Sequence, residues 1–464
     1  MKSIFGVAIA ASALAAGCSS PLSQSWDDPV SRSIRARFQA ADLQRAAGAV
    51  PPDNPAIEIE SLGSLSVDDA IRIGIANTPG LRRAGYRVDI AAGRVLQAGL
   101  YPNPSFAFDA EGLGADAGAG GETIYRVEQE IVLGGKLGKA RAVAEADRLA
   151  AQAGFVAEEF DVAARVSNAY FAAVAARERQ QSRQEMLDLS RRLFEAVSAQ
   201  VEAGSATEAD RLRAEVVREQ AEIEFETARL DATTARRLLG TVIGMEGPVT
   251  LALSTPPDEL PSFPDRDSIL AMALETNSRV SLAKIAIERA GRAHELAKAE
   301  AVPNLIASIG PRFSDIDNET TLDIGLGVEI PLFDRNQGNI HAALAERLSS
   351  AAQLREVQLQ LIGEVGEAWA AYESARLTIG RYREQLLPKA DRTLDLTRQA
   401  YERGKVGYLR LLDAQQVVIE SNIAYINALA RLQRSAALLR QLAQTEAPWR
   451  DAAAETGSLP EDTP

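Results

Sequence analysis

The strongest constraint on the fold of this 464-residue chain is that its sequence repeats itself. When the sequence is aligned with itself at an offset of about 200 residues, matching elements recur in the same order. This match predicts two copies of one structural module, residues 64–246 and 265–445, joined by a proline-containing linker at 247–264. The matched pairs are Ala70-Ile71 with Ile269-Leu270, Pro102-Asn103 with Pro303-Asn304, Glu130-Ile131-Val132-Leu133 with Glu329-Ile330-Pro331-Leu332, Asn168-Ala169-Tyr170 with Glu367-Ala368-Trp369, Glu202-Ala203-Gly204 with Glu402-Arg403-Gly404, and Leu238-Leu239 with Leu438-Leu439.

Both modules contain segments that favour very long helices. No proline occurs in residues 105–247, and residues 136–203 are almost all good helix formers. At 1.5 Å per residue, about 65 residues would form a helix about 100 Å long, which is too long for a compact domain. In residues 354–386 apolar side chains recur every three or four positions, which indicates a helix packed lengthwise against its neighbours. Pro388 predicts a kink in the second long helix only.

Between the helices, each module has segments with the two-residue period of a β-strand. In residues 321–330 every second residue is apolar, and Asp323 and Glu329 occupy alternate positions. We therefore expect one hairpin at about 103–133 and a second at about 304–332. The expected apolar positions are Phe106, Phe108, Tyr125, Val127, Ile131, Leu322, Ile324, Leu326, Val328 and Ile330.

Two hairpins supply four strands with one apolar face, which is too few for a closed structure. A bilayer tolerates strands only in closed barrels, because open edges leave backbone groups without hydrogen bonds, and known membrane barrels have at least about eight strands. Three copies of the chain would supply about twelve strands of about ten residues. The sequence therefore predicts a mainly α-helical protein with a membrane β-barrel that three chains complete together.

Composition argues against nucleic-acid binding and against catalysis. The net charge is −14, whereas a phosphate-binding surface needs a basic excess. The chain has two histidines and one cysteine, too few for most catalytic metal centres. Neither His294 nor His341 has a partner at metal-ligand spacing, and there is no nucleotide-binding loop or catalytic triad. We expect no enzyme activity, no metal site and no cofactor.

The first residues read as an export signal. Lys2 precedes a short apolar stretch, and small residues end it just before the only cysteine, Cys18. The string Leu14-Ala15-Ala16-Gly17-Cys18 resembles the bacterial lipobox, which implies removal of a signal peptide at 1–17 and attachment of diacylglycerol and a further acyl chain to Cys18. Residues 18–63 would form a tether, and 446–464 a flexible C-terminal tail.

Four short motifs carry a resemblance to a known family. The motifs are Tyr101-Pro102-Asn103-Pro104, Leu133-Gly134-Gly135-Lys136, Ile330-Pro331-Leu332-Phe333-Asp334-Arg335 and Tyr401-Glu402-Arg403-Gly404. With the tandem helix-hairpin-helix pattern, they are similar to the TolC family of outer-membrane efflux proteins, and the Leu-Gly-Gly-Lys variant is most similar to the cobalt/zinc/cadmium resistance branch.

The resemblance implies both a structure and a set of partners. It implies a homotrimer in which a 12-stranded outer-membrane β-barrel continues into a long periplasmic α-barrel. It also implies a periplasmic adaptor (membrane fusion protein) and an inner-membrane, proton-driven pump of the resistance-nodulation-division type. The chain would be a passive exit duct, and divalent heavy-metal cations are the expected cargo.

The same resemblance assigns roles to the turns where the long helices reverse. Gly204 and Gly404 fit helix C-terminal positions that need a left-handed backbone. Family members dock the adaptor and close the pore at this periplasmic tip, so Asp210, Arg410 and Asp413 are candidate gate residues. Our hypothesis is that Asp210 and Arg410 meet in the trimer; plain solvated helix ends are the alternative.

Four acidic residues are expected on the polar side of the strands, facing the lumen. Glu128, Glu130, Asp323 and Glu329 would be tripled by symmetry and would raise the local concentration of cations. A polar lining without selectivity explains the same residues, because barrel interiors are generally polar.

Two other functions remain open on the sequence alone. The duct could carry drugs or, as in type I secretion, a polypeptide, because the pore itself rarely decides the cargo. A protein of another class, a structural coiled-coil lipoprotein of the outer membrane, would explain the long helices. The amphipathic hairpins argue against that second alternative.

Overall fold

The computed structural model describes residues 63–111, 121–254, 260–314 and 319–444. The chain divides into two units at Val50 and Pro51, and every described residue belongs to the second. Cys18, most of the predicted tether and the C-terminal tail lie outside the described residues. The first module contains β1 (Ser64–Leu65), α2 (Val67–Asn77), α3 (Pro79–Ala98), β2 (Ser105–Glu111), β3 (Glu122–Ile131), α4 (Lys136–Glu202) and α5 (Glu208–Val242). The linker and second module contain β4 (Ala252–Leu253), α6 (Arg266–Thr276), α7 (Ser278–Glu300), β5 (Leu305–Ser314), β6 (Glu319–Val328), α8 (Gln337–Arg381), the π-helical η2 (Tyr382–Leu386), α9 (Leu387–Glu402) and α10 (Tyr408–Ala443).

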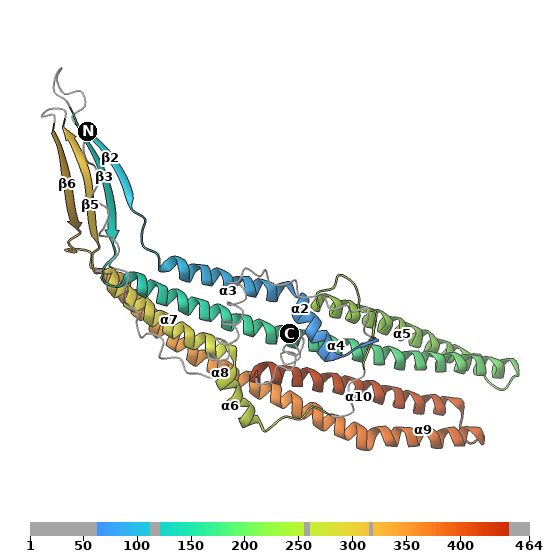
Figure 1. The fold of residues 1–464 in the computed structure, drawn as a ribbon. Helices are drawn as coiled ribbons and strands as arrows, with labels where there is room; N and C mark the ends of the chain where they lie inside the picture. Colours follow the sequence, from blue (N-terminus) through green and yellow to red (C-terminus); the bar gives the residue numbers. More distant parts are fainter. Residues whose placement is uncertain (1–62, 112–120, 255–259, 315–318, 445–464) are drawn as a thin grey trace, which may run out of the picture. The chain divides into compact units, whose positions relative to one another are not determined.

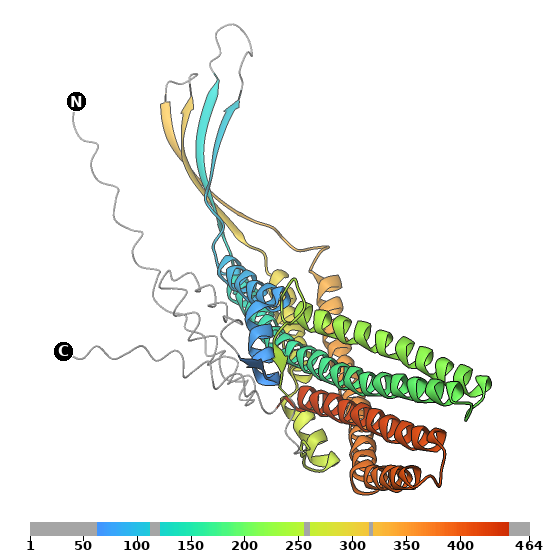
Figure 2. The same ribbon diagram turned by 90° about the vertical axis from the view of Figure 1, so that its right-hand side faces the viewer.

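The helix α4 is the longest helix of the described unit and lies at the centre of its helix packing. It runs without a break for 67 residues, from a left-handed N-cap at Gly135 to the turn at Gly204, where φ is +71°. It packs against α2, α3, α5, α7 and α10, so it contacts helices of both modules. Figure 1 and Figure 2 show α5 lying along one side of α4. The predicted long helix is confirmed.

Three apolar clusters hold these helices together. The first joins α2, α4 and the end of α5 to the short parallel pair β1 and β4. The second lies between α6, α8 and α10 and contains the predicted stripe of α8, including Leu361, Val365 and Tyr372. The third brings Leu412 and Ile419 of α10 onto α4 and α5, which fixes the second module against the first.

The four long strands form one antiparallel sheet in the order β2-β3-β5-β6, seen at the top of Figure 1. Each module contributes one hairpin, and β3 pairs with β5 to join the two hairpins. Within the described residues β2 and β6 each pair on one side only. The sheet is therefore continuous across the duplication and open at both ends.

Two details differ from expectation. Strand β6 ends at Val328, so Glu329 lies beyond the strand and not on its polar face as predicted. Pro331, which follows Glu329 and Ile330, explains the early end of the strand, because proline has no N–H to donate to a strand partner. Where Pro388 predicted a kink, the helix changes into the π-helical segment η2. Pro388 has no N–H to donate, and the wider π-helical turn just before it accommodates the missing hydrogen bond.

Candidate functional site: a two-faced sheet and two helical tips

The sheet has one face made almost entirely of apolar side chains. The register places Phe106 opposite Val127, Phe108 opposite Tyr125, and Ile309 opposite Ile324. The ring of Tyr125 lies 5.2 Å from Phe108 and 5.9 Å from Phe313, which links the two hairpins. The large exposed residues of this face are Phe106, Phe108, Tyr125, Val127, Ile131, Ile309, Phe313, Leu322, Ile324, Leu326 and Val328. Such a face is stable only against lipid or another apolar surface.

The opposite face carries every charged residue of the four strands. It has seven carboxylates and two arginines, which gives a formal charge of −5 per chain on this face. These residues are Asp109, Glu111, Glu122, Arg126, Glu128, Glu130, Arg312, Glu319 and Asp323. In a water-filled pore an excess of one charge raises the concentration of the opposite ion.

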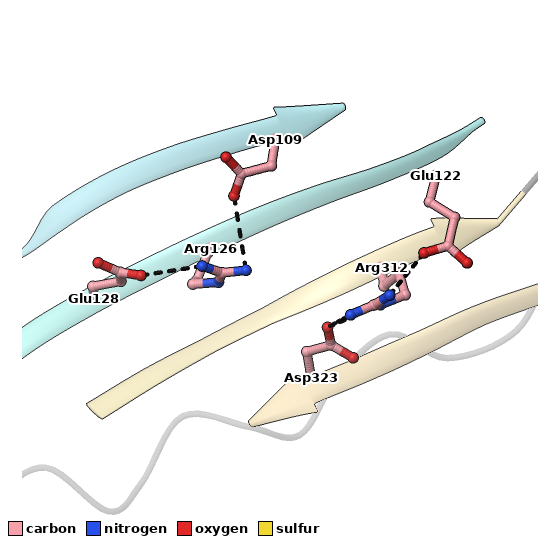
Figure 3. A network of polar contacts seen from close by, with 6 residues as sticks. All are labelled: Asp109, Glu122, Arg126, Glu128, Arg312 and Asp323. Atoms are coloured by element: carbon pink, nitrogen blue, oxygen red, sulfur yellow. Dashed lines mark hydrogen bonds and ion pairs between the residues drawn. The ribbon is translucent and has the colours of Figure 1, made fainter. Parts of the chain in front are cut away.

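Each of the two arginines is held by two carboxylates, as Figure 3 shows. The Arg126 guanidinium lies 3.3 Å from Glu128 and 3.7 Å from Asp109. Arg312 on β5 donates to Glu122 on β3 at 2.7 Å and to Asp323 on β6 at 2.6 Å. Arg312 therefore ties the first hairpin to both strands of the second.

The same face contains one nearly buried apolar residue. Ile124 is only 3% exposed, and it lies directly opposite Arg312 and two residues before Arg126. Long arginine side chains commonly cover apolar surface with their aliphatic stems. The arginines are therefore placed to cover Ile124 as well as to offset part of the negative charge of this face.

Of the four predicted lumen acids, three lie on strands and have partners. Glu128 and Asp323 pair with arginines, and Glu130 accepts a hydrogen bond of 2.5 Å from Asn304. Glu329 is exposed beyond β6. The sequence reasoning missed both arginines and their other partners, Asp109 and Glu122. The same two-residue period that selected Glu128 would have placed Arg126 beside it.

The first helical tip is tightly capped. Thr207 and Asp210 form a capping box, in which the Asp210 N–H donates to Thr207 Oγ1 and the Thr207 N–H donates to Asp210 Oδ2 at 3.1 Å. The Thr207 hydroxyl also donates to Asp210 at 2.6 Å, and these hydrogen bonds lower the pKa of the Asp210 carboxyl. Asp210 therefore has a structural role inside its own chain.

The second helical tip has the same turn without the cap. Gly404 has φ +68°, matching Gly204, but the N-cap of α10 is Gly407, which has no side chain to accept a hydrogen bond. Arg410 takes the place of Asp210 and is exposed, as is Asp413. Within the described residues Arg410 forms no ion pair, and Asp210 and Arg410 are not joined.

The remaining candidates are structural. His294 is buried in α7, and its Nδ1 lies 3.2 Å from the Ile340 carbonyl of α8; His341 is exposed. In the described part of the chain, acidic, histidine and cysteine side chains do not gather in groups that could hold a metal ion. Every described helix is too short or too polar to cross a membrane.

Comparison with known proteins places this arrangement in a family. A model of the family described as outer membrane efflux protein matches residues 71–245 and 269–444. The cobalt-zinc-cadmium resistance protein CzcC of Cupriavidus metallidurans is 25% identical over 84% of this chain and 92% of its own length. The nickel and cobalt resistance protein CnrC of the same species is 31% identical over 62% of this chain and 68% of its own length.

Solved structures show the same fold. The CmeC outer membrane channel of Campylobacter jejuni superposes with a TM-score of 0.70 at 15% identity, over 84% of this chain and 89% of that one. The open MtrE outer membrane channel of Neisseria gonorrhoeae gives 0.69 at 20% identity, over 81% and 88%. The predicted tandem TolC-like fold is confirmed, and the chain belongs to the outer membrane efflux protein family.

Proposed function

We propose that this outer-membrane efflux channel is the passive exit duct of a three-part pump, and that its cargo is divalent heavy-metal cations. Three chains would join their sheets into one barrel, with the apolar face toward lipid and the polar face toward water. A periplasmic adaptor and an inner-membrane pump of the resistance-nodulation-division type would deliver the ions. Acyl chains on Cys18 would add a second attachment to the outer membrane.

The observation that carries this proposal is the two-faced sheet with open ends. Its apolar face needs a lipid environment, and β2 and β6 need strand partners that the described chain does not supply. In a bilayer those two needs are met together only by closing the sheet into a barrel. Because the two ends differ, identical chains can join head to tail in a closed ring.

Two observations support metal cations as the cargo. The polar face has seven carboxylates for two arginines, which favours cations over anions inside the barrel. The relatives named above are resistance proteins for cobalt, zinc, cadmium and nickel. Amphiphilic drugs would not benefit from such a lining.

Ion selectivity tests the role of the polar face. In a planar bilayer under a potassium chloride gradient, we expect a reversal potential that indicates cation preference. Glu111→Gln with Glu319→Gln removes two carboxylates that have no described ion pair, so the preference should fall; Glu111→Asp with Glu319→Asp should retain it. Equal selectivity in all three proteins would exclude the lining as the cause.

A deletion strain tests the cargo. Loss of the gene should increase sensitivity to cobalt, zinc, cadmium or nickel salts, and not to a panel of amphiphilic drugs. The reverse pattern would make the protein a drug duct.

A Cys18→Ser chain should lose acylation and be less abundant in the outer membrane.

The tip hypothesis extends the proposal to the closed state. Asp210 and Arg410 would approach each other across the trimer and hold the pore shut. Charge reversal at Arg410 should then increase conductance without affecting the capping box of the first tip. Unchanged conductance would leave Arg410 as a solvated helix end.

A further inference from the structure

Inside the chain, the end of the first hairpin is bonded to the beginning of the second. Asn304, just before β5, is the centre of this junction. Its Oδ1 accepts from the Leu133 N–H at 3.2 Å and from Lys136 Nζ at 2.6 Å, and its Nδ2 donates to Glu130 Oε1 at 2.5 Å. Gly134 lies so close to Val302 that an added Cβ would be 3.2 Å from the valine Cβ.

The duplication places a second set of the same groups at the two ends of the unit. Asn103 precedes β2 as Asn304 precedes β5. In the repeat, Glu329, Leu332 and Arg335 correspond to Glu130, Leu133 and Lys136. The first three follow β6, whereas Glu130 lies near the end of β3 and the other two follow it. Asn103, Glu329 and Arg335 are exposed. In contrast to their counterparts, their side chains form no hydrogen bond or ion pair within the described residues.

Large apolar side chains are exposed beside this second set. Phe333 is 92% exposed and Tyr101 is 66% exposed. Phe333 is carried on a turn in which the Asn336 N–H donates to Asp334 Oδ1 and Asn336 Nδ2 donates to the Ala297 carbonyl, so the turn is held in place. Together with Ile330 and Leu332, which are 74% and 64% exposed, Phe333 forms an apolar patch, and such a patch is expected to have a covering partner.

A pocket lies next to Phe333. It has a volume of about 590 Å³ and is lined by residues that end α7 and by the segment between β6 and α8, including Glu329, Ile330 and Asn336. Tyr101 belongs to the other end of the unit, because α3 and β2 lie at one edge and β6 and α8 at the other. A single chain cannot bring Tyr101 of one edge to the pocket of the other.

We propose that the segment 329–335 of one copy of this chain binds the segment 100–103 of a second copy, through polar side chains that correspond in sequence to those that hold Asn304 within a chain. The Leu332 N–H already donates to the Ile330 carbonyl of its own chain at 2.8 Å. Asn103 of the second copy therefore accepts from Arg335 and donates to Glu329. Tyr101 of the second copy enters the pocket and covers Phe333. The interface therefore uses, between chains, the sequence equivalents of side chains that meet within one chain.

A second copy explains this surface better than lipid does. Lipid would cover Phe333 and Tyr101, but it would leave the amide of Asn103 and the charges of Glu329 and Arg335 without specific partners. Only another chain supplies both sets together. The inference rests on the proposed homotrimer, and it adds the residues by which neighbouring sheets are kept in register at the border between strands and helices.

Cysteine cross-linking of the full-length chain tests the interface. In Asn103→Cys with Leu332→Cys, a short bis-maleimide should join neighbouring copies, so denaturing gels should show dimers and trimers. The matched pair Leu133→Cys with Asn304→Cys occupies the internal junction and should react within one chain, giving only monomers of altered mobility. Each single variant and the native chain, which retains Cys18, measure the background.

A second pair and a measurement of mass separate the possible failures. Tyr101→Cys with Phe333→Cys should also give covalent trimers, and it does not disturb Asn103. If neither pair joins copies while the particle has the mass of three chains and conducts ions, the interface is wrong and the proposed function stands. If the solubilised particle is a single chain that conducts no ions, both are wrong.

Discussion

The two long helical hairpins of this chain come from the same repeat, but they are not equally well supported. In the first, α4 is continuous and contributes buried residues to apolar clusters along most of its length. In the second, the corresponding helix is divided into α8, η2 and α9, and Ala390 is the only buried residue of α9. The first tip has a capping box and the second has none.

This difference indicates which hairpin is less firmly held. A π-helical segment is often a place where a helix bends, and a helix end without a cap frays more easily. Arg410 adds to the difference, because a positive charge in the first turn of a helix is unfavourable. We infer that the end formed by α9 and the start of α10 is less rigid than the end formed by α4 and α5.

The largest expected effect comes from introducing the break of the second hairpin into the first. Asp188 in α4 corresponds to Pro388 at an offset of 200 residues. Asp188→Pro removes a hydrogen bond from a continuous helix that has no π-helical turn to absorb it, at a cost of about 3 kcal/mol or more. The apparent melting temperature, measured by circular dichroism in detergent, should fall clearly.

The control for this change is Asp188→Ala, which keeps the helix. Asp188 is half-exposed, accepts a hydrogen bond from Gln184 at 3.0 Å and lies 4.0 Å from Arg191. Such partly solvated contacts contribute little, so their loss should have a small effect. Pro388→Ala should stabilise the second hairpin slightly. A similar melting temperature for Asp188→Pro and Asp188→Ala would show that α4 is no stiffer than its counterpart.

The second prediction compares two tyrosines that fasten the connecting segments to the long helices. The Tyr170 hydroxyl lies 2.8 Å from the carbonyls of both Leu65 and Ser254, whereas Tyr372 donates to Pro261 alone. Burial raises the pKa of Tyr170 to about 12, so the hydroxyl stays protonated. Tyr170→Phe removes this donor from both carbonyls, and only the Leu65 carbonyl keeps a bond, from the Ser254 N–H at 3.0 Å. We expect a cost of about 1–3 kcal/mol.

Tyr372→Phe should cost less, because one carbonyl is affected. The ring contact of Tyr372 with Phe263, at 5.2 Å, remains in the variant. Unfolding of both variants in the same detergent gives the comparison directly. Equal losses would mean that the two modules are fastened equally, against the inference drawn from η2 and the second tip.

Much of this architecture could be read from the sequence because it depends on local periods. The repeat, the 3.6-residue stripe of α8 and the two-residue alternation around Asp323 each appear along a single stretch of chain. The breaks at Thr78 and Asn277, which separate α2 from α3 and α6 from α7, were not predicted. Asn277 caps α7 by accepting from the Arg279 N–H, whereas Thr78 makes no side-chain cap to α3 and is followed by Pro79. Such single-residue signals are weak without the packing around them.

The polar contacts could not be predicted, because they join residues far apart in the chain. Arg312 meets Glu122 across 190 residues, and only the pairing of β3 with β5 brings them together. The role of Asp210 was also incomplete. Thr207 three residues earlier is a recognisable capping signal, and it explains the carboxylate without a partner from another chain.

The third prediction makes the second tip resemble the first. Gly407→Thr with Arg410→Asp introduces the Thr-x-x-Asp capping box at the start of α10. The new cap should stabilise the first turn by about 1 kcal/mol, and amide hydrogen exchange there should slow accordingly. Gly407→Ala with Arg410→Ala is the control, since it stiffens the backbone without a cap. If both variants slow exchange equally, backbone entropy explains the weakness of this tip.

The smallest expected effect is a difference in the pH dependence of the two tips. Hydrogen bonds from Thr207 hold the pKa of Asp210 below its ordinary value of 3.8, so this carboxylate contributes stability that is complete above pH 3.8 and is lost as the pH falls through the lowered pKa. Amide protection in the first turn of α5 should therefore decrease below pH 3.8. The first turn of α10, which has Arg410 in place of Asp210, should lack this decrease, and Thr207→Ala should reduce it in α5. A parallel loss of protection in both tips would assign it to general acid unfolding, because only a local cap distinguishes one helix end from the other.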